Sequence, residues 1–156
     1  MKPLIVLLIA FVISQIAIYL IKDDWYLILS GNIAMCLMLC FSSVGHFAFP
    51  KGMSMMLPAF VPFKKLLVWL TGFMEIAFGI LLLFPNYRVV TGWCLIVFLI
   101  LLLPANIYAA QRHIDFEKGN HNGKGLRYLW FRVPLQLFFI GWIYVFSICP
   151  IMLVGF

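Results

Sequence analysis

Residues 3–21 read PLIVLLIAFVISQIAIYLI, and this uncharged run decides the fold. As a helix it is long enough to cross the ~30 Å of hydrocarbon in a bilayer. Only Ser14 and Gln15 interrupt its apolar residues. Lys2 in front of the run also fits a signal peptide, but no small-residue cleavage site follows it. We therefore expect a membrane span that stays in the chain.

Four further apolar runs of similar length follow, at residues 26–49, 66–84, 89–110 and 128–149. Lipid offers no hydrogen-bond partners, so each run must pair its backbone groups internally, as a helix does. None of the runs shows the alternation that is typical of barrel strands. The sequence therefore predicts an all-α integral membrane protein, with five spans in one domain over residues 1–156.

Composition leads to the same class of protein. The chain is 65% hydrophobic and 10% charged over its 156 residues, and its mean hydropathy is +1.10. A soluble domain is about half apolar and about a quarter charged, so lipid must be the solvent for most of this chain. The net charge of +6 does not indicate a nucleic-acid partner, because the cations lie in short segments between apolar runs.

Lys and Arg are distributed unequally between the two ends of the predicted spans. Of 11 in total, eight fall on one side and two on the other, and Arg132 lies inside the last span. The eight are Lys2, Lys51, Lys64, Lys65, Arg112, Lys118, Lys124 and Arg127, and the two are Lys22 and Arg88. Cytoplasmic loops carry the excess of cations, so we expect a cytoplasmic N-terminus and an extracytoplasmic C-terminus in a bacterial inner membrane.

Residues 50–63 lie between the second and third runs and are apolar but rich in Met and Pro. They are too few to span, so we expect an interfacial or re-entrant segment at the cytoplasmic end. The four cysteines show no metal-ligand spacing, and only His46 lies near a span. We therefore expect neither a metal site nor a haem.

A few polar side chains inside the spans gather in the predicted cytoplasmic half. They are His46, Glu75, Asn106, Arg132 and Gln136, from four different runs. At about 1.5 Å per residue, Glu75 lies about 15 Å past Lys65 and Arg132 about 7 Å past Arg127. Intramembrane charges cost roughly 2.5–3.5 kcal/mol at mid-helix, so they usually face the bundle and pair. We expect a polar ligand pocket in which Glu75 pairs with Arg132.

A purely structural interpretation of the same residues stays open. A buried pair of Glu75 and Arg132 can simply lock the helices together. Asn106 can satisfy a backbone carbonyl that Pro104 frees. Gly72, close to Glu75, permits a close helix contact under either interpretation.

The order of several short motifs resembles the DoxX-like family of small multi-spanning membrane proteins. They run over about residues 40–143: Gly45-His46-Phe47, Pro50, Met53 to Pro58, Thr71-Gly72 with Glu75 and Gly79, Pro104 to Tyr108, and Arg132 to Gln136 with Trp142. The resemblance implies a DoxX-like four-helix bundle, to which the first run adds an N-terminal transmembrane helix. It also implies links to quinone-coupled oxidation, to redox-stress complexes or to receptor assembly, and it draws attention to the same five polar residues.

These observations lead us to expect an accessory membrane subunit whose pocket binds a quinone or lipid-like molecule, in a complex with a membrane or redox protein. Its role would be associated with a quinone-linked oxidoreductase, and we expect no reaction from the isolated chain. One alternative is an assembly, chaperone or structural subunit without a ligand. A second is a proton-coupled small-molecule transporter, which ranks last because the polar residues reach in from the cytoplasmic side alone.

The charge bias makes the topology testable with a reporter fused after Phe156. We expect a periplasm-dependent enzyme to be active at this position, because the positive-inside rule with five spans places the C-terminus outside. The same reporter fused after Arg112 serves as the inactive control. Activity after Arg112 but none after Phe156 would contradict the orientation.

Overall fold

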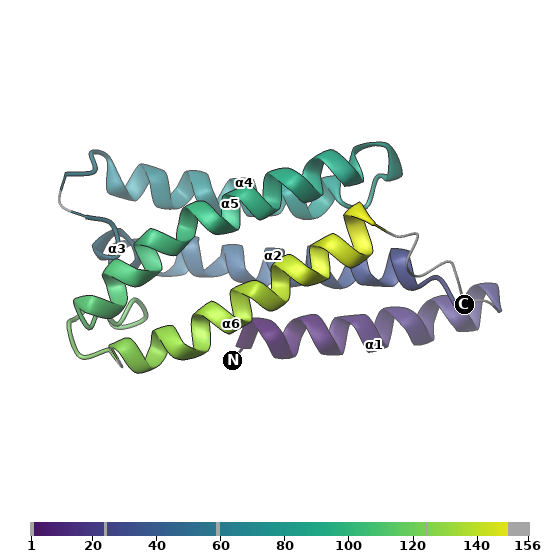
Figure 1. Ribbon diagram of the computed structural model, residues 1–156, viewed down its shortest axis with the longest axis horizontal. Helices are drawn as coiled ribbons and strands as arrows, with labels where there is room; N and C mark the ends of the chain where they lie inside the picture. Colours follow the sequence, from purple (N-terminus) through teal and green to yellow (C-terminus); the bar gives the residue numbers. More distant parts are fainter. Residues whose placement is uncertain (1, 24, 59, 124, 150–156) are drawn as a thin grey trace.

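The computed structural model describes residues 2–23, 25–58, 60–123 and 125–149. Lys124 and Phe156, which enter the predictions above, lie outside the described residues. The described chain is all-helical, with the elements shown in Figure 1. They are α1 (Lys2–Lys22), α2 (Leu27–Ala48), α3 (Pro50–Met55), α4 (Lys64–Leu81), α5 (Pro85–Gln111), α6 (Leu126–Ile143) and the π-helical turn η1 (Tyr144–Ile148).

Each of the five apolar runs forms a long helix, and four of the helices are long and apolar enough to cross a membrane. These four are α1, α2, α5 and the continuous segment Leu129–Ile148 of α6 and η1. The helix of the third run, α4, has 18 residues and carries Lys64, Lys65 and Glu75. Length and composition therefore support four of the five expected spans.

Proline sets two of the helix starts. Pro50 and Pro85 stand in the first turns of α3 and α5, where the missing N–H would have no helical partner. We expected Pro85 to end the third run and the next span to begin at residue 89. Instead Pro85 begins α5, which reaches residue 111 without a break at Pro104.

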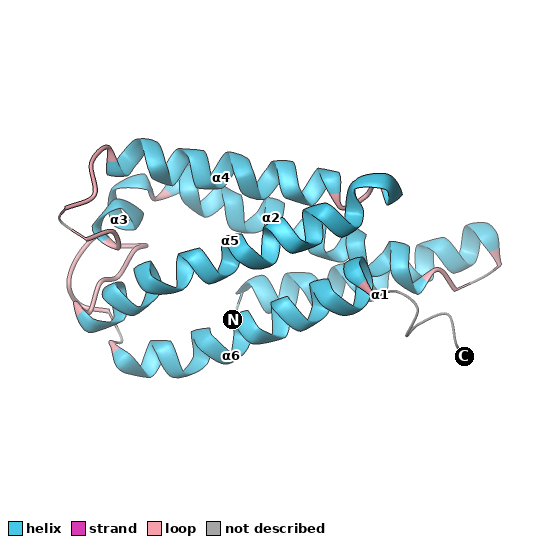
Figure 2. Ribbon diagram, turned by 45° about the horizontal axis from the view of Figure 1, so that its top comes forward, coloured by secondary structure: helices cyan, strands magenta, loops and turns pink. Residues whose placement is uncertain are grey.

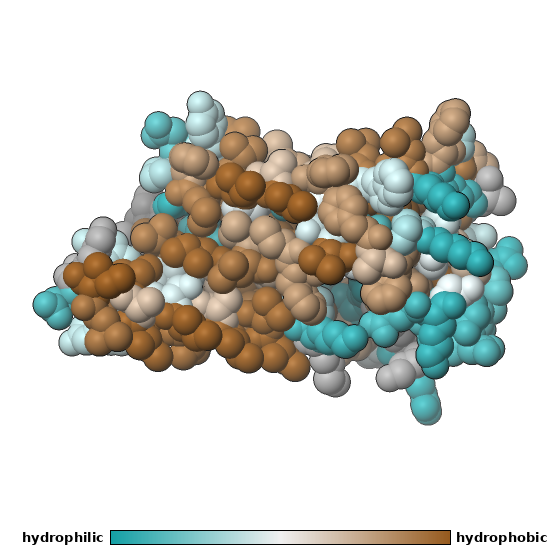
Figure 3. All heavy atoms as spheres, turned by 180° about the vertical axis from the view of Figure 1, so that it is seen from behind, coloured by the Kyte–Doolittle hydropathy of each residue, from teal (hydrophilic) through white to brown (hydrophobic). Residues whose placement is uncertain are grey.

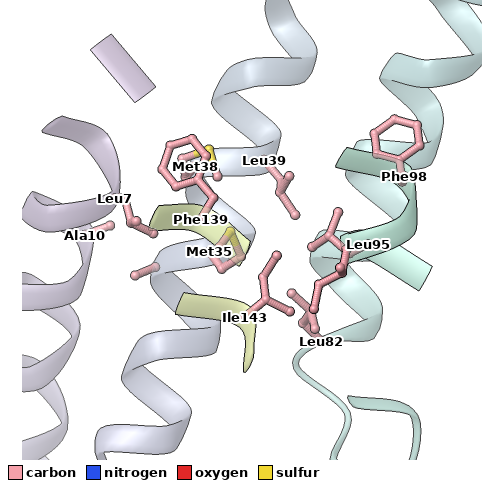
Figure 4. Packing of buried hydrophobic residues seen from close by; sticks show 12 residues of the cluster. Leu7, Ala10, Met35, Met38, Leu39, Leu82, Leu95, Phe98, Phe139 and Ile143 are labelled. Carbon is pink, nitrogen blue, oxygen red and sulfur yellow. The ribbon is translucent and has the colours of Figure 1, made fainter. Parts of the chain in front are cut away.

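The long helices run antiparallel in sequence order, and α2 occupies the centre (Figures 1 and 2). It packs along α4 on one side and along α1 on the other. The pair α5 and α6 lies across these three helices and meets α2 mainly through η1. The core is an apolar cluster from all of the long helices, with Leu7, Met35, Leu82, Leu95 and Ile143 fully buried (Figure 4).

The outer surface is apolar along the helices and polar at one end. Figure 3 shows hydrophobic residues over most of one face and hydrophilic residues gathered at the end that holds α3 and the start of α4. The antiparallel order brings Lys51, Lys64, Arg112 and Arg127 to this end, because each lies at the corresponding terminus of its helix. The unequal distribution of Lys and Arg in the sequence therefore gathers positive charge at one end of the bundle.

A buried hydrogen-bond network joins α2 to the C-terminal turn at the opposite end. Asn32 is fully buried, and its Nδ2 donates to the carbonyl oxygens of Ile28 at 2.7 Å and Phe146 at 2.9 Å. Its Oδ1 accepts from the Ser147 hydroxyl at 2.7 Å. The wider π-helical turn is closed by the Cys149 N–H, which donates to the Tyr144 carbonyl at 2.8 Å. The network fixes where η1 meets α2.

Replacement of Asn32 by Leu should destabilise the fold, because it leaves the buried Ser147 hydroxyl without its acceptor. A buried group that loses its partner costs about 1–3 kcal/mol. The measurement is the unfolding midpoint in detergent, with Asn86→Leu at the exposed start of α5 as the matched control. Equal midpoints for the two variants would show that the network contributes nothing.

Candidate functional site

The site is built around a histidine and a carboxylate that face each other across α2 and α4. His46 lies in the last turn of α2, and its Nε2 is 3.4 Å from Oε1 of Glu75 on α4. Both side chains are largely buried, with exposed fractions of 12% for His46 and 6% for Glu75. The contact is within ion-pair range but slightly longer than an ordinary hydrogen bond. A small movement would therefore bring the two side chains within hydrogen-bonding distance.

The other ring nitrogen of His46 contacts a backbone carbonyl and a hydroxyl of α4. Nδ1 of His46 lies 3.1 Å from the Val68 carbonyl oxygen and 3.0 Å from Oγ1 of Thr71. The Thr71 hydroxyl donates to the same Val68 carbonyl at 2.8 Å. Since a carbonyl oxygen only accepts, its hydrogen bond with His46 requires the proton on Nδ1. These contacts fix the orientation of the ring, with Nε2 toward Glu75.

Gly72 is the residue that lets the two helices approach closely enough. A Cβ at this position would lie 2.8 Å from Cβ of His46 and 3.2 Å from the Phe47 ring. An alanine there would push α4 away from α2 or force His46 to move. The glycine therefore sets the distance between His46 and Glu75.

Glu75 keeps one oxygen unused. Oε2 is buried and has no hydrogen-bond partner among the described residues, and Glu75 as a whole is 5% exposed. Buried polar atoms are nearly always hydrogen-bonded, and an orphaned charged oxygen costs more than an ordinary unmade bond. Oε2 is therefore available to one further hydrogen-bond donor.

The expected pairing of Glu75 with Arg132 is wrong, because the carboxylate pairs with His46 instead. The prediction rested on depth alone, and depth does not say which way a helix face points. Arg132 lies on α6, which packs mainly against α5, whereas α4 packs mainly against α2. Arg132 is half-buried and engaged in other interactions.

The remaining two predicted residues belong to the α5–α6 pair. Nε2 of Gln136 donates to the Leu99 carbonyl oxygen of α5. Asn106 is buried on α5, with 6% of its surface exposed. The structure thus brings His46 and Glu75 together, with Thr71 added. Gln136 instead links α6 to α5 through the Leu99 backbone carbonyl.

The segment after α2 folds back beside the site. Residues Pro50–Met55 form α3, which packs against α4, and Met56 is buried at its end. The Phe49 ring contacts the Phe116 ring, with centroids 6.5 Å apart, and so ties this segment to the loop before α6. Together the two segments cover the end of the bundle where His46 lies.

Sequence reasoning missed Thr71 and Asn32 as members of buried polar networks. Thr71 precedes Gly72 and faces the same neighbour, and Asn32 is an amide in the middle of an apolar run. Either feature could have indicated a buried hydrogen bond. No group of three or more His, Cys, Asp or Glu side chains in the described ranges is placed to hold a metal ion.

The fold fits an all-helical, membrane-embedded protein. Within that class, a family model described as "Domain of unknown function (DUF8561)" matches residues 35–147, and the chain belongs to this family. The match runs from the middle of α2 to the end of η1 and leaves α1 outside. No curated protein and no solved structure matches the chain.

A double-mutant cycle should distinguish the observed pair from the expected one. Glu75→Ala and His46→Ala remove the two sides of one buried contact, so we expect a coupling free energy of about 0.5–3 kcal/mol. Glu75→Ala and Arg132→Ala touch separate contacts and should add within about 0.5 kcal/mol. The measurement is the free energy of unfolding in detergent. Coupling to Arg132 with none to His46 would contradict the geometry.

Proposed function

We propose that this chain is a small membrane subunit that binds the head group of a quinone or similar amphipathic molecule at His46 and Glu75. The observation that carries the proposal is the buried, unpartnered Oε2 of Glu75 beside the imidazole of His46. The reduced form of a quinone carries ring hydroxyls, and one of these supplies the donor that Oε2 lacks. The resemblance to DoxX-like proteins supports the same ligand class and a place in a redox-linked complex.

The proposal places the site in the cytoplasmic half of a five-span bundle in a bacterial inner membrane. α4 completes the five spans, because it packs on α2 and its two lysines fall at its first turn. Its remaining charge, Glu75, faces the bundle and is paired, which lowers the cost of placing it in lipid. α3 and the loop to α6 then lie at the cytoplasmic surface, at the end with most of the cations.

The amphipathic partner reaches the site from the bilayer, so the chain needs no soluble domain to capture it. Asn106 on α5 is a further buried polar residue. We assign no reaction to the chain alone. It holds a head group, and electron transfer would belong to a partner protein.

One observation favours the alternative, an assembly or structural subunit without a ligand. A shallow apolar hollow on α6 is lined by Leu129, Trp130, Val133 and Pro134, and Trp130 is 84% exposed. A large aromatic anchor beside such a hollow is typical of a contact with another protein. Under this alternative, Trp130→Ala abolishes the function in cells while Glu75→Gln leaves it intact.

The ligand proposal is tested with decylubiquinol, a short-chain quinol, and the purified protein in detergent. We expect saturable binding, and at least a tenfold weaker affinity for Glu75→Leu, which removes the acceptor. Arg127→Gln, on the exposed start of α6, is the control and should bind like the wild type. Equal affinity of Glu75→Leu and the wild type would contradict the proposal.

A further inference from the structure

Two polar side chains, one on α1 and one on α2, are buried without hydrogen-bond partners among the described residues, far from His46 in the chain. Gln15 on α1 is 6% exposed, and neither its Oε1 nor its Nε2 makes a hydrogen bond with a described residue. Ser30 on α2 is fully buried, and its hydroxyl is also unpartnered. Such groups are rare in native proteins and call for a ligand, a water molecule or a strained role.

The helix register places these two side chains at the same level. α1 and α2 are antiparallel, and Ala10 of α1 belongs to one apolar cluster with Met35 of α2 (Figure 4). One helical turn further along, α1 reaches Ser14 and Gln15 while α2 reaches Gly31 and Ser30. The free amide of Gln15 and the free hydroxyl of Ser30 therefore belong to one layer of the α1–α2 seam.

The surroundings of this layer are aromatic and uncharged. The Phe11 ring lies 5.1 Å from the Trp142 ring and 5.6 Å from the Phe146 ring, measured between centroids. The Phe146 ring packs directly on Gly31, and Nε1 of Trp142 donates to the Gly31 carbonyl at 3.0 Å. An ion would be costly in such a layer, whereas a neutral group with both donors and acceptors suits Gln15 and Ser30.

α1 can also move away from the bundle more readily than the other long helices, because it packs chiefly on one neighbour. It packs chiefly on α2, and Val12, Ile13 and Ile16 beside Gln15 are more than half exposed. Those residues face the lipid in a membrane, so a molecule in the bilayer can reach the seam from the side. The unsatisfied amide and hydroxyl weaken the helix contact at the same level.

We propose that the α1–α2 seam at Gln15 and Ser30 binds the neutral head group of a membrane amphiphile, through a hydroxyl or ester carbonyl. The Gln15 amide both donates and accepts, and the Ser30 hydroxyl supplies the second contact. This site lies at the other end of α2 from His46 and does not depend on the function proposed there. It also gives α1, which the family match does not include, a role of its own.

The test uses the purified full chain in detergent and monoolein, a neutral glyceride, with binding counted by native mass spectrometry. We expect saturable binding of one molecule to the wild type, and at least a tenfold weaker affinity for Gln15→Leu. Ser43→Ala removes a buried hydroxyl that is already bonded to the Cys40 carbonyl, and it should bind like the wild type. Oleate, which is charged, should not compete.

A second measurement separates lost binding from lost folding. Gln15→Leu removes an unsatisfied polar group, so the ligand-free variant should unfold at a temperature no lower than the wild type. Undiminished monoolein binding by Gln15→Leu, absence of saturable binding to the wild type, or a lower unfolding temperature for the variant would each overturn the proposal.

Discussion

The close contact between α2 and α4 at Gly72 is the constraint on which the rest of the structure depends. It brings the His46 ring against the backbone of α4 and within 3.4 Å of Glu75. In an apolar bundle a carboxylate must find a partner, so the pair fixes both the depth and the rotation of α4 relative to α2. The same contact leaves the second oxygen of Glu75 without a hydrogen-bond donor, and the proposed function rests on this unpartnered oxygen.

A second polar centre, at the opposite end of α2, has a different character. Asn32 satisfies all of its hydrogen-bonding groups with Ile28, Phe146 and Ser147, and it ties the π-helical turn to the bundle. A fully satisfied network of this kind specifies one packing arrangement. Between the two centres the α2 face contributes Met35 and Leu39 to the apolar core. The polar network at Asn32 is therefore fully hydrogen-bonded, whereas the one at Glu75 lacks one hydrogen-bond donor.

The helices were predictable from the sequence, and the side-chain partners were not. Long uncharged runs leave the backbone no alternative to a helix, so each expected run appears as one. Residue depth follows from simple counting, and it placed Glu75 correctly inside its helix. The direction in which a side chain points depends on which helices pack together. Because α4 packs on α2, Glu75 contacts His46 and not Arg132. Pro85 likewise begins α5 and does not end α4, because a proline in the first turn of a helix loses no helical hydrogen bond.

A hydrogen bond from an amphipathic ligand to Oε2 of Glu75 is the central interaction that we propose. The most direct test is a density map of the protein in lipid nanodiscs containing decylubiquinol. The account predicts ring-shaped density with an oxygen within about 2.5–3.0 Å of Oε2, the range for such hydrogen bonds. A well-resolved map in which Oε2 is bonded within the chain, with no ligand beside it, would contradict the claim.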